Sequence, residues 1–335
     1  QSSAWTFAHD LGRRHVEDVF GDQVETSFLE SVPEDGQAYG ALKRLAEEKH
    51  DVLFATSPAF LTAALRVAME HPDTAVFACA ETVSYRHVTT YFGRMYEARF
   101  LSGVVAGSVT ASDRIGYIGT FPTPEVLCSI NAYALGAAMV NPRVRVSVRW
   151  LHQWDSREKS QKAGHDLIES GVDVITHHNV LSSREIAPEY GVYSMVCDVD
   201  AERYVPREYL AAPVWNWGIF YEKIIRNLLN GTFGALSELY GEGQRRINFW
   251  WGLDSGIVDF FYSRRLVPLH TQKLLELLKR DIGNQSFHPF TGPIRDQSGR
   301  LRLAEGEVAG HDQVLAMDWL VDLVEADGLA GAGQA

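Results

Sequence analysis

The stretch between Arg114 and Asn179 contains three short apolar runs: RIGYIGT (114–120), VRVSVRW (144–150) and VDVITHHN (172–179). Runs of this length are typical of buried strands. Between them lie two segments with apolar residues at helical spacing, SINAYALGAAMV (129–140) and SQKAGHDLIES (160–170). Gly171 follows the second helix, in the position that ends helices without Cβ strain. The β-α-β-α-β order predicts a parallel sheet with right-handed crossovers.

The carboxyl ends of these predicted strands carry most of the aromatic and polar side chains of the stretch. In open parallel sheets, ligands bind in the crevice outside those ends. We therefore expect a ligand site near the following residues: Phe121, Pro122, Trp154, Asp155, His177, His178 and Asn179.

Length and charge limit the class of protein. A chain of 335 residues suits two lobes of about 150 residues each. The net charge of −12 argues against a nucleic-acid partner. No run approaches the ~18 apolar residues of a membrane span.

Cys79, Cys128 and Cys197 lie in or beside apolar runs without CxxC spacing, which predicts buried free thiols.

The predicted fold class is α/β, with two doubly wound parallel-sheet lobes joined by a multi-strand hinge. Lobe one comprises residues 1–112 and about 213–258, and lobe two comprises residues 113–212 and about 259–335. A parallel α/β lobe usually opens with a strand, but the first periodic element here is a helix from Ser3 to Phe20. The first strand of lobe one is therefore expected to be missing from this sequence.

Other segments also predict definite elements. VETSFLE (24–30) reads as a strand, and the small residues Ser102, Gly103, Ala106 and Gly107 predict a closely packed helix. INFWWGLDSGIVDFFY (247–262) reads as two short strands around a turn, and residues 288–303 as a hairpin-like pair. The segment Asp312 to Glu325 has the pattern of a final helix.

The sequence contains no recognisable catalytic constellation. A P-loop, a dinucleotide fingerprint, a nucleophile elbow and HExxH are all absent. Adjacent residues on a strand point to opposite faces, which argues against a metal site at His177-His178. Asp198 and Asp200 could act as paired carboxylates, or could lie in a solvated loop.

Aromatic residues recur at predicted loop and hinge positions, which suits a flat ring held by stacking. Trp5 and Trp154 occupy element boundaries and are the best candidates, whereas Trp250 and Trp251 are expected to pack. Ser57 and Glu81 end predicted strands. Ser57 is either an edge contact or a helix N-cap, and Glu81 is either an edge contact or solvent-exposed.

With these motifs in view, the sequence resembles the basic membrane protein (BMP) family of purine- and nucleoside-binding subunits of ABC importers. The resemblance covers some 300 residues and includes AWTFAHDLGR (4–13), GRMYEARFLSGVVAG (93–107), PFTGPIRDQSG (289–299) and WGLDSGIV (251–258). It implies a type I periplasmic-binding fold whose two lobes close on a ligand in the cleft between them.

The resemblance also implies a set of ligand contacts. Trp5 matches the aromatic that stacks on the base, and Thr6 and His9 lie beside it. The remaining matches are Ser57 and Glu81 in lobe one, and Phe121, Trp154, Asn179 and Trp215 in the second lobe and hinge. At the GL-x-D-G turn, Ser255 holds the position that an acid occupies in nucleoside-binding relatives, which favours a free base over a nucleoside.

The expected function is therefore non-catalytic binding of a purine base (adenine- or guanine-like) or nucleoside by a monomer. The expected role is the substrate-binding component of an ABC importer, with the permease as partner, no cofactor and no metal. Such a protein would be extracytoplasmic and lipid-anchored or periplasmic after signal removal. Two alternatives stay open: a cytoplasmic ligand-sensing domain of a larger regulatory protein, and a nucleoside- or purine-processing enzyme.

Overall fold

The computed structural model describes residues 4–81, 85, 87–154, 156–178, 190–196, 209–233 and 249–326. The chain divides into two compact units. The seven-stranded unit comprises Gln1–Ala8, Arg94–Trp215 and Gly252–Ala335, and the four-stranded unit comprises His9–Gly93 and Asn216–Trp251. The sequence analysis places the end of the first segment of lobe one at residue 112, whereas the seven-stranded unit already begins again at Arg94. The predicted lobe boundaries stay a prediction.

The four-stranded unit has a parallel sheet in the order β1-β2-β3-β9. Its elements are α1 (Ala4–Phe20, whose first residues belong to the other unit), η1 (Gly21–Gln23), α2 (Gln37–Glu47), β1 (Val52–Ala55), η2 (Pro58–Phe60), α3 (Leu61–Glu70), β2 (Ala75–Cys79), β3 (Thr89–Gly93), α8 (Trp217–Leu229) and β9 (Phe249–Trp251). Gly12 and Gly218 let α1 and α8 approach closely, because a Cβ on Gly12 would lie 2.9 Å from the Gly218 nitrogen.

The seven-stranded unit has a sheet in the order β10-β8-β7-β6-β4-β5-β13. All its strand pairs are parallel except β10-β8. Its elements are α4 (Met95–Val109), β4 (Arg114–Gly119), α5 (Pro124–Val140), β5 (Arg145–Trp150), α6 (Arg157–Glu169), β6 (Val174–His177), β7 (Tyr193–Met195), β8 (Tyr209–Trp215), β10 (Val258–Tyr262), α10 (Leu269–Gly283), the hairpin β11 (Ile294–Arg295) and β12 (Leu301–Leu303), α11 (His311–Leu315) and β13 (Val324–Ala326).

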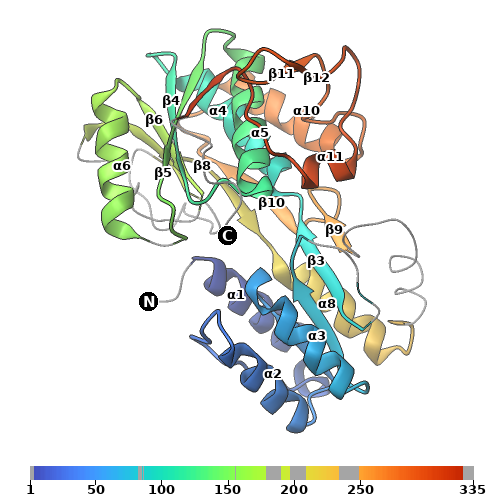
Figure 1. Ribbon diagram of the computed structural model, residues 1–335. Helices are drawn as coiled ribbons and strands as arrows, with labels where there is room; N and C mark the ends of the chain where they lie inside the picture. Colours follow the sequence, from blue (N-terminus) through green and yellow to red (C-terminus); the bar gives the residue numbers. More distant parts are fainter. Residues whose placement is uncertain are drawn as a thin grey trace. The chain divides into compact units, whose positions relative to one another are not determined.

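The βαβαβ order predicted around residues 114–178 is confirmed as β4-α5-β5-α6-β6. In Figure 1, α6 covers one face of this sheet, and α4 and α5 lie against the other. Helices α4 and α5 pack backbone against backbone. A Cβ on Gly103 would lie 2.0 Å from the Tyr133 carbonyl oxygen, and one on Gly136 would lie 2.0 Å from that of Phe100. The close packing expected of Gly103 is therefore confirmed, and it places α4 in the seven-stranded unit.

Two sequence predictions differ from the structure. Residues 24–30 form no strand, because they are mostly exposed and Thr26 and Ser27 bond to the side chains of Arg13 and His50. The predicted final helix ends at Leu315, and Val324–Ala326 instead pairs with β5. The two short strands expected within residues 247–262 are confirmed as β9 and β10, which belong to different sheets.

Candidate functional site

The carboxyl ends of β4 and β5 bring two predicted site residues together in the seven-stranded unit. The rings of Phe121 and Trp154 lie 5.3 Å apart between centroids, at an angle of 56°. Trp154 is 45% exposed, an unusual value for a tryptophan in a protein with a large apolar core. His152 approaches Phe121 from its edge, at 6.5 Å. The exposed Trp154 and the half-buried Phe121 therefore keep part of their aromatic surface accessible at the sheet edge where ligands bind in parallel sheets.

A second aromatic pair joins the start of α1 to the end of β8. Trp5 and Trp215 meet edge to face, with centroids 5.6 Å apart and an angle of 83° between the rings. Trp215 is buried and Trp5 is half-buried, so Trp5 keeps part of its surface accessible. Thr6, beside it on the helix, is exposed.

His9 lies in the core of the four-stranded unit. Its Nδ1 is 2.6 Å from the Tyr221 hydroxyl, and its ring stacks on Trp217 at 4.6 Å and 9°. Burial lowers the pKa of His9 to about 3, so the ring is neutral at physiological pH. This packing gives His9 a structural role, and ligand contact through it stays a prediction.

Ser57 and Glu81 are the other two candidate site residues of the four-stranded unit. Ser57 accepts a hydrogen bond from the Ala59 amide at 3.3 Å, as the N-cap of η2, and its hydroxyl donates to Glu34 at 2.5 Å. The N-cap alternative for Ser57 is therefore confirmed. Glu81 follows β2 and is half-buried. Asn179, Cys197, Asp198 and Asp200 lie outside the described residues.

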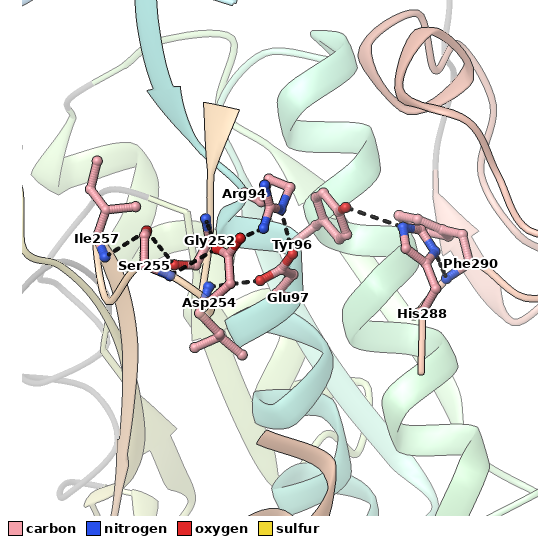
Figure 2. A network of polar contacts seen from close by, with 10 residues as sticks. Arg94, Tyr96, Glu97, Gly252, Asp254, Ser255, Ile257, His288 and Phe290 are labelled. Carbon is pink, nitrogen blue, oxygen red and sulfur yellow. Dashed lines mark hydrogen bonds and ion pairs between the residues drawn. The ribbon is translucent and has the colours of Figure 1, made fainter. Parts of the chain in front are cut away.

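Ser255 belongs to a polar network that the sequence analysis did not predict (Figure 2). Its hydroxyl donates to the Gly252 carbonyl at 2.9 Å and accepts from the Ile257 amide at 3.3 Å. Asp254, beside it, accepts from the Gly252 and Ser255 amides, both at 2.9 Å, and lies 2.8 Å from the Arg94 guanidinium. The carboxylate of Asp254 therefore stabilises the turn and pairs with Arg94.

Arg94 joins that turn to the start of α4. Its Nε donates to Glu97 at 2.5 Å, and Glu97 in turn accepts the Leu253 amide at 2.8 Å. Burial raises the pKa of the Glu97 carboxyl against the opposing effect of Arg94. For Asp254 the balance is reversed: burial would raise its pKa, but Arg94 and the two amides lower it. An acid three residues after an arginine at a helix start was the only sequence signal of this cluster.

Neighbouring Tyr96 connects the same helix to the segment after α10. Its hydroxyl lies 3.2 Å from Nε2 of His288, whose Nδ1 accepts the Phe290 amide at 3.1 Å (Figure 2). Burial lowers the pKa of His288. The start of α4 is therefore held by two other segments of the seven-stranded unit.

Neither a metal site nor a membrane span is found in the described part of the chain. Among its residues, no group of three or more His, Cys, Asp or Glu side chains could hold a metal ion. No helix within that part has both the length and the apolar character needed to cross a membrane. Cys79 and Cys128 are buried, as expected, and Cys79 is a free thiol.

Comparison with known proteins identifies close relatives. The family described as "Bmp: ABC transporter substrate-binding protein PnrA-like" matches residues 1–284. A purine-binding protein of Brucella abortus is 33% identical over 318 residues, which are 95% of this chain and 87% of that protein. A putative ABC transporter glucose-binding protein of Haloferax volcanii is 32% identical over 255 residues, which are 76% of this chain and 62% of that protein.

Solved structures show the same fold. The crystal structure of ABC transporter solute-binding proteins from Aeropyrum pernix K1 matches with a TM-score of 0.67 at 15% sequence identity. The match covers 92% of this chain and 90% of that chain. The α/β architecture with parallel sheets is thus that of type I periplasmic-binding-like solute-binding proteins, as predicted.

Proposed function

Because the chain belongs to the family of PnrA-like ABC-transporter substrate-binding proteins, we propose that it binds a purine base and delivers it to a membrane permease. The observation that carries the proposal is the 33% identity, over 95% of this chain, to a purine-binding protein. Binding changes no covalent bond of the ligand in this proposal. The protein would act outside the cytoplasm, where importers collect their substrates.

The aromatic side chains support a planar ligand. Trp154 is 45% exposed and Phe121 is half-buried, so both keep aromatic surface accessible at the carboxyl edge of the seven-stranded sheet. Each aromatic stacking contact contributes about 0.5–1.5 kcal/mol beyond the area that it buries. A purine has two flat faces and several edge acceptors and donors, so stacking and a few hydrogen bonds suffice to hold it.

The turn at residues 252–257 supports a free base over a nucleoside. The position that an acid holds in nucleoside-binding relatives is occupied here by Ser255, whose hydroxyl is bonded within the turn. The neighbouring acid, Asp254, binds two backbone amides and Arg94 through one carboxylate oxygen. The relative described as glucose-binding makes a hexose the second candidate ligand, because sugars also stack on aromatic faces.

Isothermal titration calorimetry tests this proposal directly. Adenine, guanine, adenosine and glucose are titrated into the wild-type protein, and we expect a purine base to bind most tightly. Trp5→Ala should weaken adenine binding at least about 10-fold, which corresponds to the loss of one stacking contact of ~1.4 kcal/mol. Trp5→Phe keeps a ring and is the matched control.

One result would contradict the proposal, and another would contradict the role of Trp5 in it. Tight binding of glucose without binding of either base would assign the protein to sugars. Equal adenine affinity in Trp5→Ala, Trp5→Phe and wild type would remove Trp5 from the site. Chromatography of adenosine after incubation with the protein tests the enzyme alternative, and we expect adenosine to be recovered unchanged.

The ligand-sensing alternative predicts the same ligand and a different partner. A pull-down from membranes with purine-saturated protein separates the two roles. Recovery of the permease supports the transport role, whereas its absence beside tight purine binding supports the sensor.

A further inference from the structure

His178 lies at the carboxyl end of β6, where both of its ring nitrogens meet polar side chains. Nε2 is 2.8 Å from the Glu125 carboxylate in the first turn of α5. Nδ1 is 3.0 Å from the hydroxyl of Tyr117 in β4. The side chain of His178 is only 6% exposed and that of Glu125 only 17%. The imidazole therefore connects three elements of the seven-stranded unit inside its core.

The chemistry of the partners determines which nitrogen carries the proton. Burial by itself would raise the pKa of Glu125, but His178, Arg99 and the Ser129 hydroxyl outweigh it and lower that pKa. An ionised carboxylate only accepts hydrogen bonds, so Nε2 of His178 is the protonated nitrogen. With the proton on Nε2, Nδ1 can accept from the Tyr117 hydroxyl.

The backbone around His178 is held from another side. Arg99, fully buried in α4, donates to the carbonyl oxygens of His177 at 3.1 Å and His178 at 3.0 Å. The His178 amide donates to the Ile118 carbonyl at 3.0 Å. Ring and main chain are thus bonded independently, which leaves the end of β6 little freedom.

The same pair restrains the turn between β4 and α5. Glu125 follows Phe121 by four residues, and the Thr123 amide closes the turn onto the Phe121 carbonyl at 2.8 Å. A shift of Glu125 would therefore move the turn that presents Phe121 beside Trp154. Ligand sites need contact residues held to within about 0.5 Å by supporting hydrogen bonds.

We propose that His178 and Glu125 are a positioning pair: their buried bond holds the end of β6 and the Phe121 turn in the arrangement that binds ligand. The inference rests on the proposed function, because it assigns the pair to the same purine site. Neither residue needs to touch the ligand. Loss of their bond should loosen the turn and lower ligand affinity while the rest of the sheet stays folded.

Two substitutions of His178 test the effect on binding. The amide nitrogen of Gln lies near the position of Nε2, so His178→Gln keeps a donor for Glu125. The shorter Asn lacks that reach, so His178→Asn loses the donor. We expect calorimetry with adenine to show a loss of about 10-fold or more for His178→Asn and a smaller loss for His178→Gln. Equal affinities in the two variants would overturn the proposal.

A second measurement needs no ligand. Hydrogen exchange of the His178 amide, followed by NMR, reports how firmly the end of β6 is held. We expect exchange about 10-fold faster in Glu125→Ala than in Glu125→Gln, which keeps an acceptor oxygen. If both variants keep the thermal unfolding midpoint of the wild type, the faster exchange is confined to the end of β6.

The two measurements separate this inference from the proposed function. Faster exchange without weaker adenine binding would reduce the pair to a folding contact and overturn the proposal. If wild type binds no purine, the proposed function fails, and the proposed purine role of the pair fails with it. The exchange comparison then still decides whether the pair holds the strand end.

Discussion

The guanidinium of Arg94 lies 2.8 Å from the carboxylate of Asp254, although the two residues are far apart in sequence. Each lies near the point where the chain leaves a strand of the four-stranded unit, β3 or β9, and enters the seven-stranded unit. Those strands are neighbours, with Gly93 paired to Trp251. The ion pair therefore connects the segment that follows β3 to the segment that follows β9, both within the seven-stranded unit.

Gly252→Ala should break this cluster. A Cβ at Gly252 would lie 2.2 Å from the Glu97 carboxylate, so Glu97 or the turn must shift. We expect a loss of about 1–3 kcal/mol in the free energy of unfolding, the usual cost of overpacking. Gly40→Ala is the control, because no atom lies within 4 Å of its added methyl. Urea unfolding measures both variants, and equal stabilities would contradict the close contact.

His9 predicts a pH dependence of stability. The unfolded ring takes up a proton below pH ~6.5, whereas burial holds the folded pKa at about 3. Between these values unfolding binds a proton, so its free energy should fall as pH falls, by up to ~1.4 kcal/mol per pH unit. Above pH ~6.5 His9 contributes no slope.

Denaturant unfolding between pH 3 and 8 measures this slope. His9→Asn removes the titration but keeps a polar atom near Nδ1 for Tyr221. The difference between the two curves isolates His9 from the carboxylates, which both proteins share. A difference that does not change with pH would show that folding does not lower the pKa of His9.

Ser255→Asp should move ligand preference toward nucleosides. The substitution restores the acid of the GL-x-D-G turn while Asp254 keeps its bonds to Arg94 and the turn amides. We expect the ratio of adenosine to adenine affinity, measured by calorimetry, to rise about 10-fold, the effect of one hydrogen bond to a charged group. Ser255→Asn carries no charge and is the control. A ratio that rises equally in both variants would exclude the charge as its cause.

Trp154 predicts an optical signal of binding. Its indole is 45% exposed beside Phe121, so a stacked purine should quench its fluorescence. Adenine titration should change the emission of wild type, and Trp154→Phe should lose most of that change. Trp319→Phe is the matched control, because Trp319 packs against Arg302 at 5.4 Å. A signal that survives in Trp154→Phe would place the ligand elsewhere.

Local pattern was sufficient for much of the fold. The strands and helices between Arg114 and His177 were predictable because each has its own periodicity and its own end signals. The helix prediction for Asp312 to Glu325 failed because β13 depends on β5, some 180 residues earlier. Residues 24–30 have the composition of a strand but bond through their side chains.

The candidate site shows the same division. The aromatic pairs Trp5–Trp215 and Phe121–Trp154 involve residues that sequence reasoning had named one by one. Phe121 and Trp154 were expected at the same sheet edge, but the contact of Trp5 with Trp215 was not predictable, because it joins the start of α1 to the end of β8. The stacking role of each ring stays a prediction.

The amino-acid sequence by itself determined the family, the parallel α/β class and the aromatic character of the expected site, because these depend on residue type and local spacing. Only the tertiary structure decided the partners of the buried charges. Glu125 could not be assigned to His178, nor Asp254 to Arg94, since a buried charge is stable only beside a partner that folding brings to it.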